Sequence, residues 1–242
     1  MKNYFVILLS FFLIFSCTKK EEIPTAESIY ISAFKLLKNK NYLDSAKEFE
    51  KIDDEFPFSK WAIKGQVMAS YAYFKNKDFD KVIQISEDFT RLNPVNKYIP
   101  YMLYMKGLCY YLQIPSITRA QDNSKQASMI FRELIAKFPE SDHAIDAIEK
   151  LKFIDEHLAG AHLSQARHQI KIENYIGAIN NLQFMINRYR NSSQLPEAFF
   201  RLAEIYCFLG EVKECQKAKV ILELNFFESQ WYIDSQKIPI AN

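Results

Sequence analysis

The chain has 242 residues, a formal net charge of +2 and only five glycines, while aromatic residues make up 15% of the sequence. The near balance of charge excludes the electrostatics of a nucleic-acid-binding protein and of a protein held on anionic lipid by basic residues. Scarce glycine is unfavourable for phosphate-binding loops, and plentiful aromatic side chains favour packed helices over disorder.

A short hydrophobic segment at the N-terminus predicts export. Lys2 supplies a positive charge, the stretch from Tyr4 to Phe15 is apolar but short for a membrane span, and Ser16 precedes Cys17. This order outlines a lipobox, with an ordinary signal peptide or an uncleaved anchor as the alternatives. We expect residues 1–16 to be a lipoprotein signal peptide, Cys17 to be the lipidated first residue of the mature protein, and residues 17–25 to be a tether.

The residue after the lipobox bears on localisation. Thr18 is not the aspartate that commonly retains lipoproteins in the inner membrane. We therefore expect a lipid-anchored protein on the periplasmic face of the outer membrane.

Three cysteines remain after Cys17, namely Cys109, Cys207 and Cys215. An odd number in an oxidising compartment argues against a disulfide framework, and it favours buried thiols that pack between helices. A bridge between Cys207 and Cys215 across the turn at Gly210 is the alternative.

Residues 26–140 contain a repeat with the spacing of tetratricopeptide (TPR) units. Prolines stand at Pro57, Pro94 and Pro139, and small or apolar residues precede them by twelve and twenty-four positions: Ser45, Val82 and Ala127, then Ala33 and Ser70. In that register two antiparallel helices approach closely at the small positions. We expect three helix pairs here, the third with an insertion of about eight residues between its helices.

The ends of the units predict where helices stop and start. Proline ends one helix and serine caps the next in Phe56 to Ser59 and in Phe138 to Ser141. Serine recurs without proline in Tyr189 to Ser192 and Phe226 to Ser229. At the end of the second unit, Asn96 can cap the next helix in place of serine.

The apolar pattern from Ser141 to about Ile172 is helical without a break. It predicts one long helix, or two nearly collinear ones. Two further helix pairs are expected after it, with their small positions at Ala166 and Ala178 and at Ala203 and Cys215. The predicted fold is all-α: a TPR superhelix of about five helix pairs, in two sub-groups joined by a long helix. We assign residues 26–140 to the first sub-group, 141–232 to the long helix and the last pairs, and 233–242 to a tail.

No constellation of residues predicts catalysis or metal binding. His143, His157, His162 and His168 are not spaced three or four residues apart, so they do not share a helix face as ligands would. We expect neither an enzyme nor a cofactor.

The first helix of each TPR pair lines the concave face, and here its inward positions are aromatic. They are Tyr30, Phe34, Tyr71, Phe74, Tyr101 and Tyr104, bordered by Lys38, Lys64 and Lys75. Flat apolar surface with cationic ends predicts a groove for an extended peptide that carries an aromatic side chain or a terminal carboxylate. Packing of these aromatics between neighbouring repeats is the alternative.

Seven segments, in order along the chain, resemble the outer-membrane assembly lipoprotein family known as BamD or YfiO. They are Glu55 to Ser59, Ser70 to Lys75, Phe89 to Pro94, Tyr101 to Gly107, Arg119 to Ala127, Asn174 to Asn180 and Asn225 to Trp231. The resemblance covers nearly the whole mature chain. It departs at Asn181, where many members carry arginine.

This resemblance implies a non-catalytic subunit of the machinery that inserts β-barrel proteins into the outer membrane. The expected partners are a BamA-like barrel subunit, the other lipoproteins of the machinery, and the unfolded C-terminal segments of outer-membrane proteins, which end in an aromatic residue. It also implies that the C-terminal repeats contact the barrel subunit, with Tyr175, Asn180 and Asn181 as candidate partner-binding residues.

Two other functions fit a TPR lipoprotein. One is a pilotin or cell-envelope scaffold for secretion or pilus assembly. The other is the helical superhelix of a lytic transglycosylase, which we disfavour because no catalytic domain is expected in the few residues after Trp231.

Overall fold

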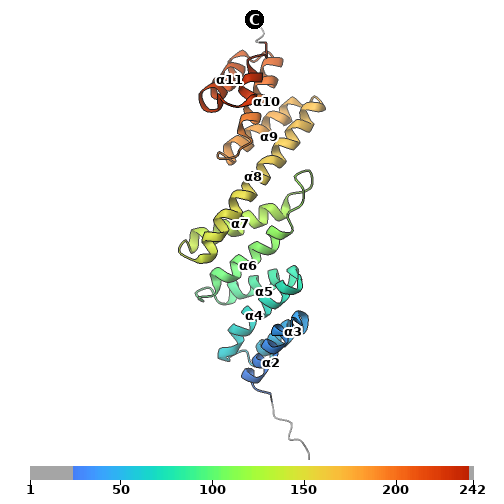
Figure 1. The fold of residues 1–242 in the computed structure, drawn as a ribbon, viewed down its shortest axis with the longest axis vertical. Coiled ribbons are helices and arrows are strands. Elements are labelled where there is room, and N and C mark those ends of the chain that lie inside the picture. Colours follow the sequence, from blue (N-terminus) through green and yellow to red (C-terminus); the bar gives the residue numbers. More distant parts are fainter. Residues whose placement is uncertain (1–23, 240–242) are drawn as a thin grey trace, which may run out of the picture.

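The computed structural model describes residues 24–239 and folds them entirely into helices and connecting turns (Figure 1). Cys17, the predicted lipidation site, lies outside the described residues. The helices are α2 (Ala26–Lys38), α3 (Tyr42–Glu55), α4 (Lys60–Asn76), α5 (Phe79–Leu92), α6 (Ile99–Leu112), α7 (Asp122–Lys137), α8 (Asp142–Lys171), α9 (Tyr175–Arg188), α10 (Leu195–Phe208), α11 (Val212–Phe226) and α12 (Gln230–Ser235).

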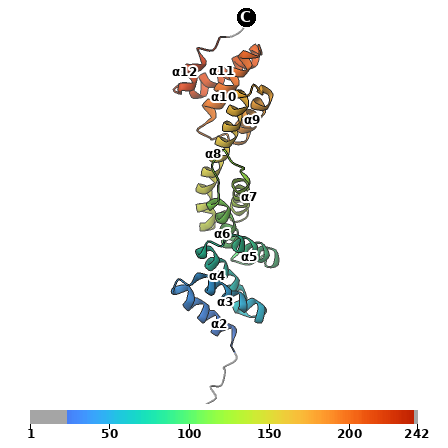
Figure 2. The same ribbon diagram turned by 90° about the vertical axis from the view of Figure 1, so that its right-hand side faces the viewer.

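Successive helices pack as antiparallel pairs that stack into an elongated rod, with the N-terminal pair and the C-terminal pair at opposite ends (Figures 1 and 2). Four of the pairs turn through one residue of positive φ, at Lys40, Lys77, Glu173 and Gly210. The pair α6 and α7 instead has the longer connection 113–121. This architecture is the predicted TPR superhelix of five helix pairs.

The small residues that define the repeat lie where paired helices touch. Ala33 on α2 and Ser45 on α3 are fully buried, and the Ser45 hydroxyl donates a hydrogen bond to the Ala33 carbonyl at 2.8 Å. A larger side chain at either position would separate the two backbones. The contact confirms the register deduced from the spacing.

Serine caps the helices that follow three of the predicted boundaries. The Ser59, Ser141 and Ser229 hydroxyls accept hydrogen bonds from the first backbone amides of α4, α8 and α12. Asn96 and Ser192 do not cap in this way, because α6 and α10 begin three residues later, with Pro100 and Pro196 in their first turns. The Asn96 and Ser192 side chains accept instead from the amides two residues on.

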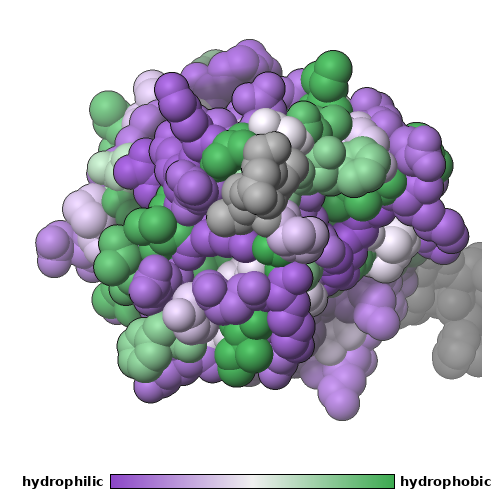
Figure 3. Space-filling view, turned by 90° about the horizontal axis from the view of Figure 1, so that it is seen from above, coloured by the Kyte–Doolittle hydropathy of each residue, from purple (hydrophilic) through white to green (hydrophobic). Residues whose placement is uncertain are grey.

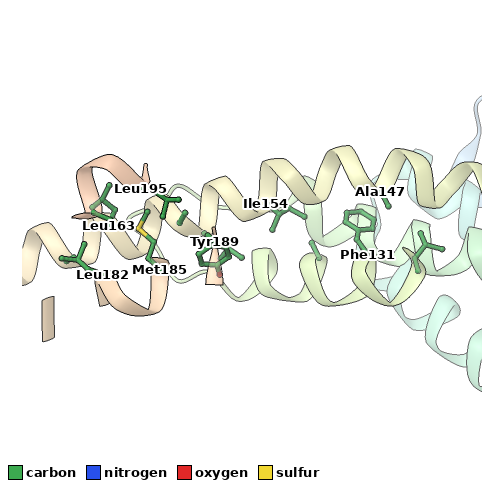
Figure 4. Packing of buried hydrophobic residues seen from close by; sticks show 14 of the residues in the cluster. Phe131, Ala147, Ile154, Leu163, Leu182, Met185, Tyr189 and Leu195 are labelled. Atoms are coloured by element: carbon green, nitrogen blue, oxygen red, sulfur yellow. The ribbon is translucent and has the colours of Figure 1, made fainter. Parts of the chain in front are cut away.

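Helix α8 is one continuous helix of 30 residues, and its buried face joins the two sub-groups. Ala147 and Ile154 pack with Phe131 of the third pair, while Leu163 packs with Leu182 of the fourth (Figure 4). These residues belong to a single hydrophobic cluster that runs from α5 to α11. The sub-groups therefore share a core through α8.

The cysteine prediction was wrong for two of the three residues. Cys207 on α10 and Cys215 on α11 form a disulfide, with their Cα atoms 5.1 Å apart. The tight turn at Gly210 brings the facing ends of the two helices together, and an odd number of cysteines does not exclude one bond. Cys109 is a buried free thiol, as expected.

None of the helices within residues 24–239 combines the length and the apolar character that crossing a bilayer requires.

Candidate functional site

The predicted peptide groove lies on α2, α4 and α6, the first helices of the first three pairs. Helix α4 contacts both α2 and α6. The three helices thus form one continuous face, and the candidate residues are distributed along it. They fall into an exposed group and a group that packs into the protein.

The exposed group consists of Phe34, Tyr71, Lys38, Lys64 and Lys75. Phe34 and Tyr71 keep 38% and 37% of their surface accessible, so part of each ring is open to a partner. The Lys38 ammonium lies 5.1 Å from the centre of the Phe34 ring. This arrangement offers a partner aromatic surface together with positive charge.

Trp61 joins this face, and it was missed by the sequence reasoning. Its ring lies 4.8 Å from that of Tyr30, and the Lys64 ammonium lies 4.8 Å above it. Tyr30 also stacks in parallel with Phe34, at 6.5 Å. Because Trp61 comes two residues after the cap at Ser59 and three before Lys64, the helical spacing could have revealed it.

The remaining aromatics of the prediction pack into the protein. The Tyr104 hydroxyl donates a hydrogen bond to Asp146 on α8 at 2.5 Å, and its ring stacks on His143. Tyr101 is half-buried, and burial raises its pKa, with the Tyr71 phenol adding a smaller contribution. Phe74 lies against Phe79, at 5.8 Å. These three side chains thus make packing contacts with other residues of the chain.

The third lysine of the prediction, Lys75, lies near the C-terminal end of α4. Lys75 lies near Tyr42 of α3, with 6.0 Å between its ammonium and the ring centre. Its side chain is exposed at the end of α4, as Lys38 is at the end of α2. Lys38 and Lys75 thus lie at the C-terminal ends of α2 and α4, the first helices of successive pairs.

The candidate partner-binding residues lie on α9. Asn180 is exposed, whereas the Asn181 carboxamide is satisfied internally: Nδ2 donates to Gln169 at 2.8 Å, and Oδ1 lies 3.1 Å from the His162 ring. Asn181 orients α9 against α8 and has little left to offer a partner. Tyr175 packs against Phe208 at 5.1 Å.

Tyr175 also lines an apolar cavity of about 520 Å³ between α8, α9, α10 and the segment that follows α12. Ile170, Ile205 and Phe208 form its apolar walls. Phe208 is 71% exposed. At this end of the molecule hydrophobic residues lie interspersed with hydrophilic ones (Figure 3).

A buried carboxylate that the sequence did not reveal fixes the C-terminal pair to α8. Glu197 on α10 is only 5% exposed and binds Arg167 of α8 through two hydrogen bonds. Arg201, one turn further along α10, binds the same carboxylate at 3.3 Å. A buried glutamate is tolerated only with such partners, and this cluster links α10 to α8.

Histidine, cysteine and carboxylate side chains do not gather in groups of three that could hold a metal ion anywhere in residues 24–239. His143 and His157 instead stack on aromatic rings, of Tyr104 and Phe153 respectively.

The stacked antiparallel helix pairs place the chain among the helical-repeat proteins of the TPR type. A model of the family YfiO, described as outer membrane lipoprotein, matches residues 23–221. The chain therefore belongs to this outer membrane lipoprotein family, as the order of its sequence segments predicted.

Curated relatives named outer membrane protein assembly factor BamD cover most of the chain. The protein of Caulobacter vibrioides is 28% identical over 92% of this chain and 75% of its own length. That of Rickettsia prowazekii is 30% identical, covering 89% and 88%, and that of Neisseria meningitidis serogroup A is 31% identical, covering 85% and 80%.

Among solved structures, the type IV pilus biogenesis factor PilW aligns with 89% of this chain and all of its own at 12% identity, with a TM-score of 0.39. This likeness is too low to argue for a shared function.

Proposed function

We propose that this chain is a non-catalytic lipoprotein subunit of the outer-membrane β-barrel assembly machinery, which holds unfolded outer-membrane protein segments and couples them to a BamA-like barrel subunit. Membership of the family and the name of the relatives support its place in outer membrane protein assembly. The exposed pair Phe34 and Tyr71, next to Lys38 and Lys64, carries the proposal that clients bind on α2, α4 and α6.

The chemistry of this face fits the end of an unfolded barrel strand. Aromatic side chains of an extended client can lie against Phe34 and Trp61, and against Tyr71 about 15 Å further along α4, while its terminal carboxylate can pair with a lysine. Rigid aromatic anchors give much of the affinity in such contacts, typically about 2 kcal/mol or more for each hot spot.

A fluorescently labelled peptide that ends in phenylalanine tests the client site. The double variant Phe34→Ala with Tyr71→Ala should bind it at least about tenfold more weakly, with nearly unchanged thermal unfolding, because both side chains are exposed. Phe58→Ala is the matched control, since Phe58 is a fully exposed aromatic outside this face. Equal affinity of the double variant and the control would refute the site.

The lysines have a separate test. Amidation of the peptide's C-terminus should weaken binding to the natural chain, and it should have no effect on a Lys38→Gln, Lys64→Gln variant, because the carboxylate has then lost its partners. An equal effect of amidation on both proteins would show that the carboxylate binds elsewhere.

We also propose that the C-terminal repeats contact the barrel subunit. Tyr175, Asn180 and the apolar cavity beside Phe208 lie there. Substituting Asn180→Glu and Phe208→Ala together should reduce co-purification with that subunit while leaving binding of the client peptide unchanged. Unaltered co-purification would move the contact elsewhere.

The proposed anchor is the acyl chain on Cys17. A fatty-acid analogue should label the natural chain, and Cys17→Ala should release the protein from the membrane fraction. An unlabelled natural chain found only in the soluble fraction would contradict this part of the proposal.

A further inference from the structure

The connection between α6 and α7 differs from the other four turns and encloses a cavity. The other pairs use a short turn with one residue of positive φ, whereas residues 113–121 form a longer loop that projects along the rod toward the C-terminal repeats (Figure 1). Between this loop and α8 lies a cavity of about 610 Å³, a size typical of ligand-binding clefts.

The loop is held in one shape by a single buried side chain. Gln121, 9% exposed, donates through Nε2 to the Ser116 and Arg119 carbonyls at 2.9 and 2.8 Å, and it accepts from the Ser124 hydroxyl at 2.8 Å. Asn123 adds a hydrogen bond to the Gln113 carbonyl. The cavity wall is therefore pre-organised, which lowers the entropic cost of binding.

The ionisable side chains that line this cavity are all basic. Arg119 and Lys125 come from the loop and α7, and His162 and His168 from α8. Within residues 24–239, no aspartate or glutamate lines the cavity, and neither Arg119 nor Lys125 forms an ion pair.

Three other cations on α7 and α8 are paired with carboxylates. Arg132 on α7 binds Asp155, and Lys137 and Lys152 each pair with a glutamate on their own helix. Arg119 and Lys125 thus stand at the cavity wall without a carboxylate, whereas these three cations of α7 and α8 are paired. Such a site attracts an anionic group from outside.

The apolar surroundings favour a protein segment as the source of that anionic group. Leu158 forms part of the wall, and Ile117 on the loop is 39% exposed. Phe184, 52% exposed, lies 4.7 Å from the His162 ring. An acidic peptide with apolar side chains matches both features, because its carboxylates meet the cations while its apolar groups cover the exposed Ile117 and Phe184.

We infer that the cavity between the α6–α7 loop and α8 binds a glutamate- or aspartate-bearing segment of a partner protein. The site is separate from the exposed face on α2, α4 and α6. It stands or falls independently of the proposed client binding, because Arg119 and Lys125 take no part in that face.

Fluorescence anisotropy with a defined probe tests the inference. A fluorescein-labelled decapeptide that alternates glutamate with leucine should bind the full chain, and the same peptide with glutamine in place of glutamate should bind at least about tenfold more weakly. The variant Arg119→Glu with Lys125→Glu should lose about tenfold or more of the affinity for the acidic peptide. Binding of the peptide that ends in phenylalanine should not change.

The control reverses the same number of charges elsewhere. Lys47 and Lys213 are exposed on α3 and α11. Lys47→Glu with Lys213→Glu should leave binding of the acidic peptide within about twofold of the natural chain at 0.15 M salt, where distant surface charges are screened. An equal loss in both double variants would reduce the effect to net charge and overturn the inference.

Two further results would also overturn it. One is equal affinity for the glutamate and glutamine peptides. The other is binding to vesicles containing phosphatidylglycerol that Arg119→Glu with Lys125→Glu abolishes, together with unchanged binding of the acidic peptide. That outcome would assign the cations to a lipid headgroup instead.

Discussion

Replacing Gly107 by alanine tests the close approach on which the repeat depends. Gly107 occupies the small position of α6, where it faces Phe131 of α7. A Cβ atom at Gly107 would lie 2.5 Å from Phe131 Cε1 and 2.8 Å from Cδ1. Because carbon atoms in contact are normally about 3.5 to 4.0 Å apart, the added methyl group overlaps the ring by about 1 Å.

The ring has no free space into which to move. Phe131 is fully buried in the cluster that α8 also joins. Overpacking of this kind costs about 1 to 3 kcal/mol, and a wedge against a fixed ring falls at the upper end. Alanine recovers about 1 kcal/mol because it favours a helix more than glycine does. We therefore expect a net loss of about 2 kcal/mol, or about 4 to 8 °C in Tm for a chain of this size.

Thermal and urea unfolding followed by circular dichroism measure this loss. Gly160→Ala is the matched control, since its Cβ would meet the movable end of Gln194 at 3.1 Å. It should change the stability little. Phe131→Leu should partly rescue Gly107→Ala, so that the double variant is more stable than the sum of the single effects by about 1 kcal/mol. Equal Tm values for Gly107→Ala and Gly160→Ala would refute the reasoning.

Three other substitutions have defined outcomes. Glu197→Ala removes the carboxylate shared by two arginines and should cost about 2 kcal/mol in urea unfolding, less than a fully buried pair because one arginine stays half exposed. Burial raises the pKa of Glu156, but hydrogen bonds from Ser193 and its neighbours outweigh this and leave the pKa below its ordinary value. The Glu156 carboxylate therefore contributes its full share to the free energy of unfolding above the ordinary pKa of 4.5, and this share is lost as pH falls through the pKa of the folded protein. Because Glu156→Gln removes the titrating group, its Tm should fall less at acid pH than that of the natural chain. Cys207→Ser with Cys215→Ser should cost about 2.5 kcal/mol, the entropy of closing so short a loop, and the natural chain should show no reaction of these thiols with a maleimide before reduction.

The sequence predicted the fold because its small residues and helix boundaries are local signals. The twelve-residue spacing from Ala33 to Ser45 places two small side chains opposite each other, and the structure joins them by a hydrogen bond. Capping by Ser59 and Ser141 was predictable because the serine hydroxyl accepts a hydrogen bond from a backbone amide only three residues later, which requires no contact with a distant part of the chain. The start of α10 was expected directly after Ser192, but the helix begins at Leu195, because Pro196 fits into the first turn of a helix.

The candidate face was only partly predictable, because helical spacing shows which side of a helix a residue occupies but not how deeply it is buried. Phe34 and Tyr104 occupy the same side of their helices. Tyr104 is held by Asp146, which is 42 residues away, and no local pattern reveals that pairing. The bridge between Cys207 and Cys215 was only the alternative for a related reason, since the count of cysteines says nothing of the distance between two Cα atoms.

The length of the continuous helix α8 determines how the last helix pairs are rotated, about the α8 axis, relative to the first three. Each residue of an α-helix advances by about 1.5 Å and turns by about 100°. One residue added near the middle of α8 would therefore swing the last two helix pairs by more than a quarter of a revolution, while seven would restore the direction to within about 20° and lengthen the rod by about 10 Å. The number of residues in α8 thus determines which way the two ends face, and a deletion there would misdirect a bound partner even if every contact residue remained.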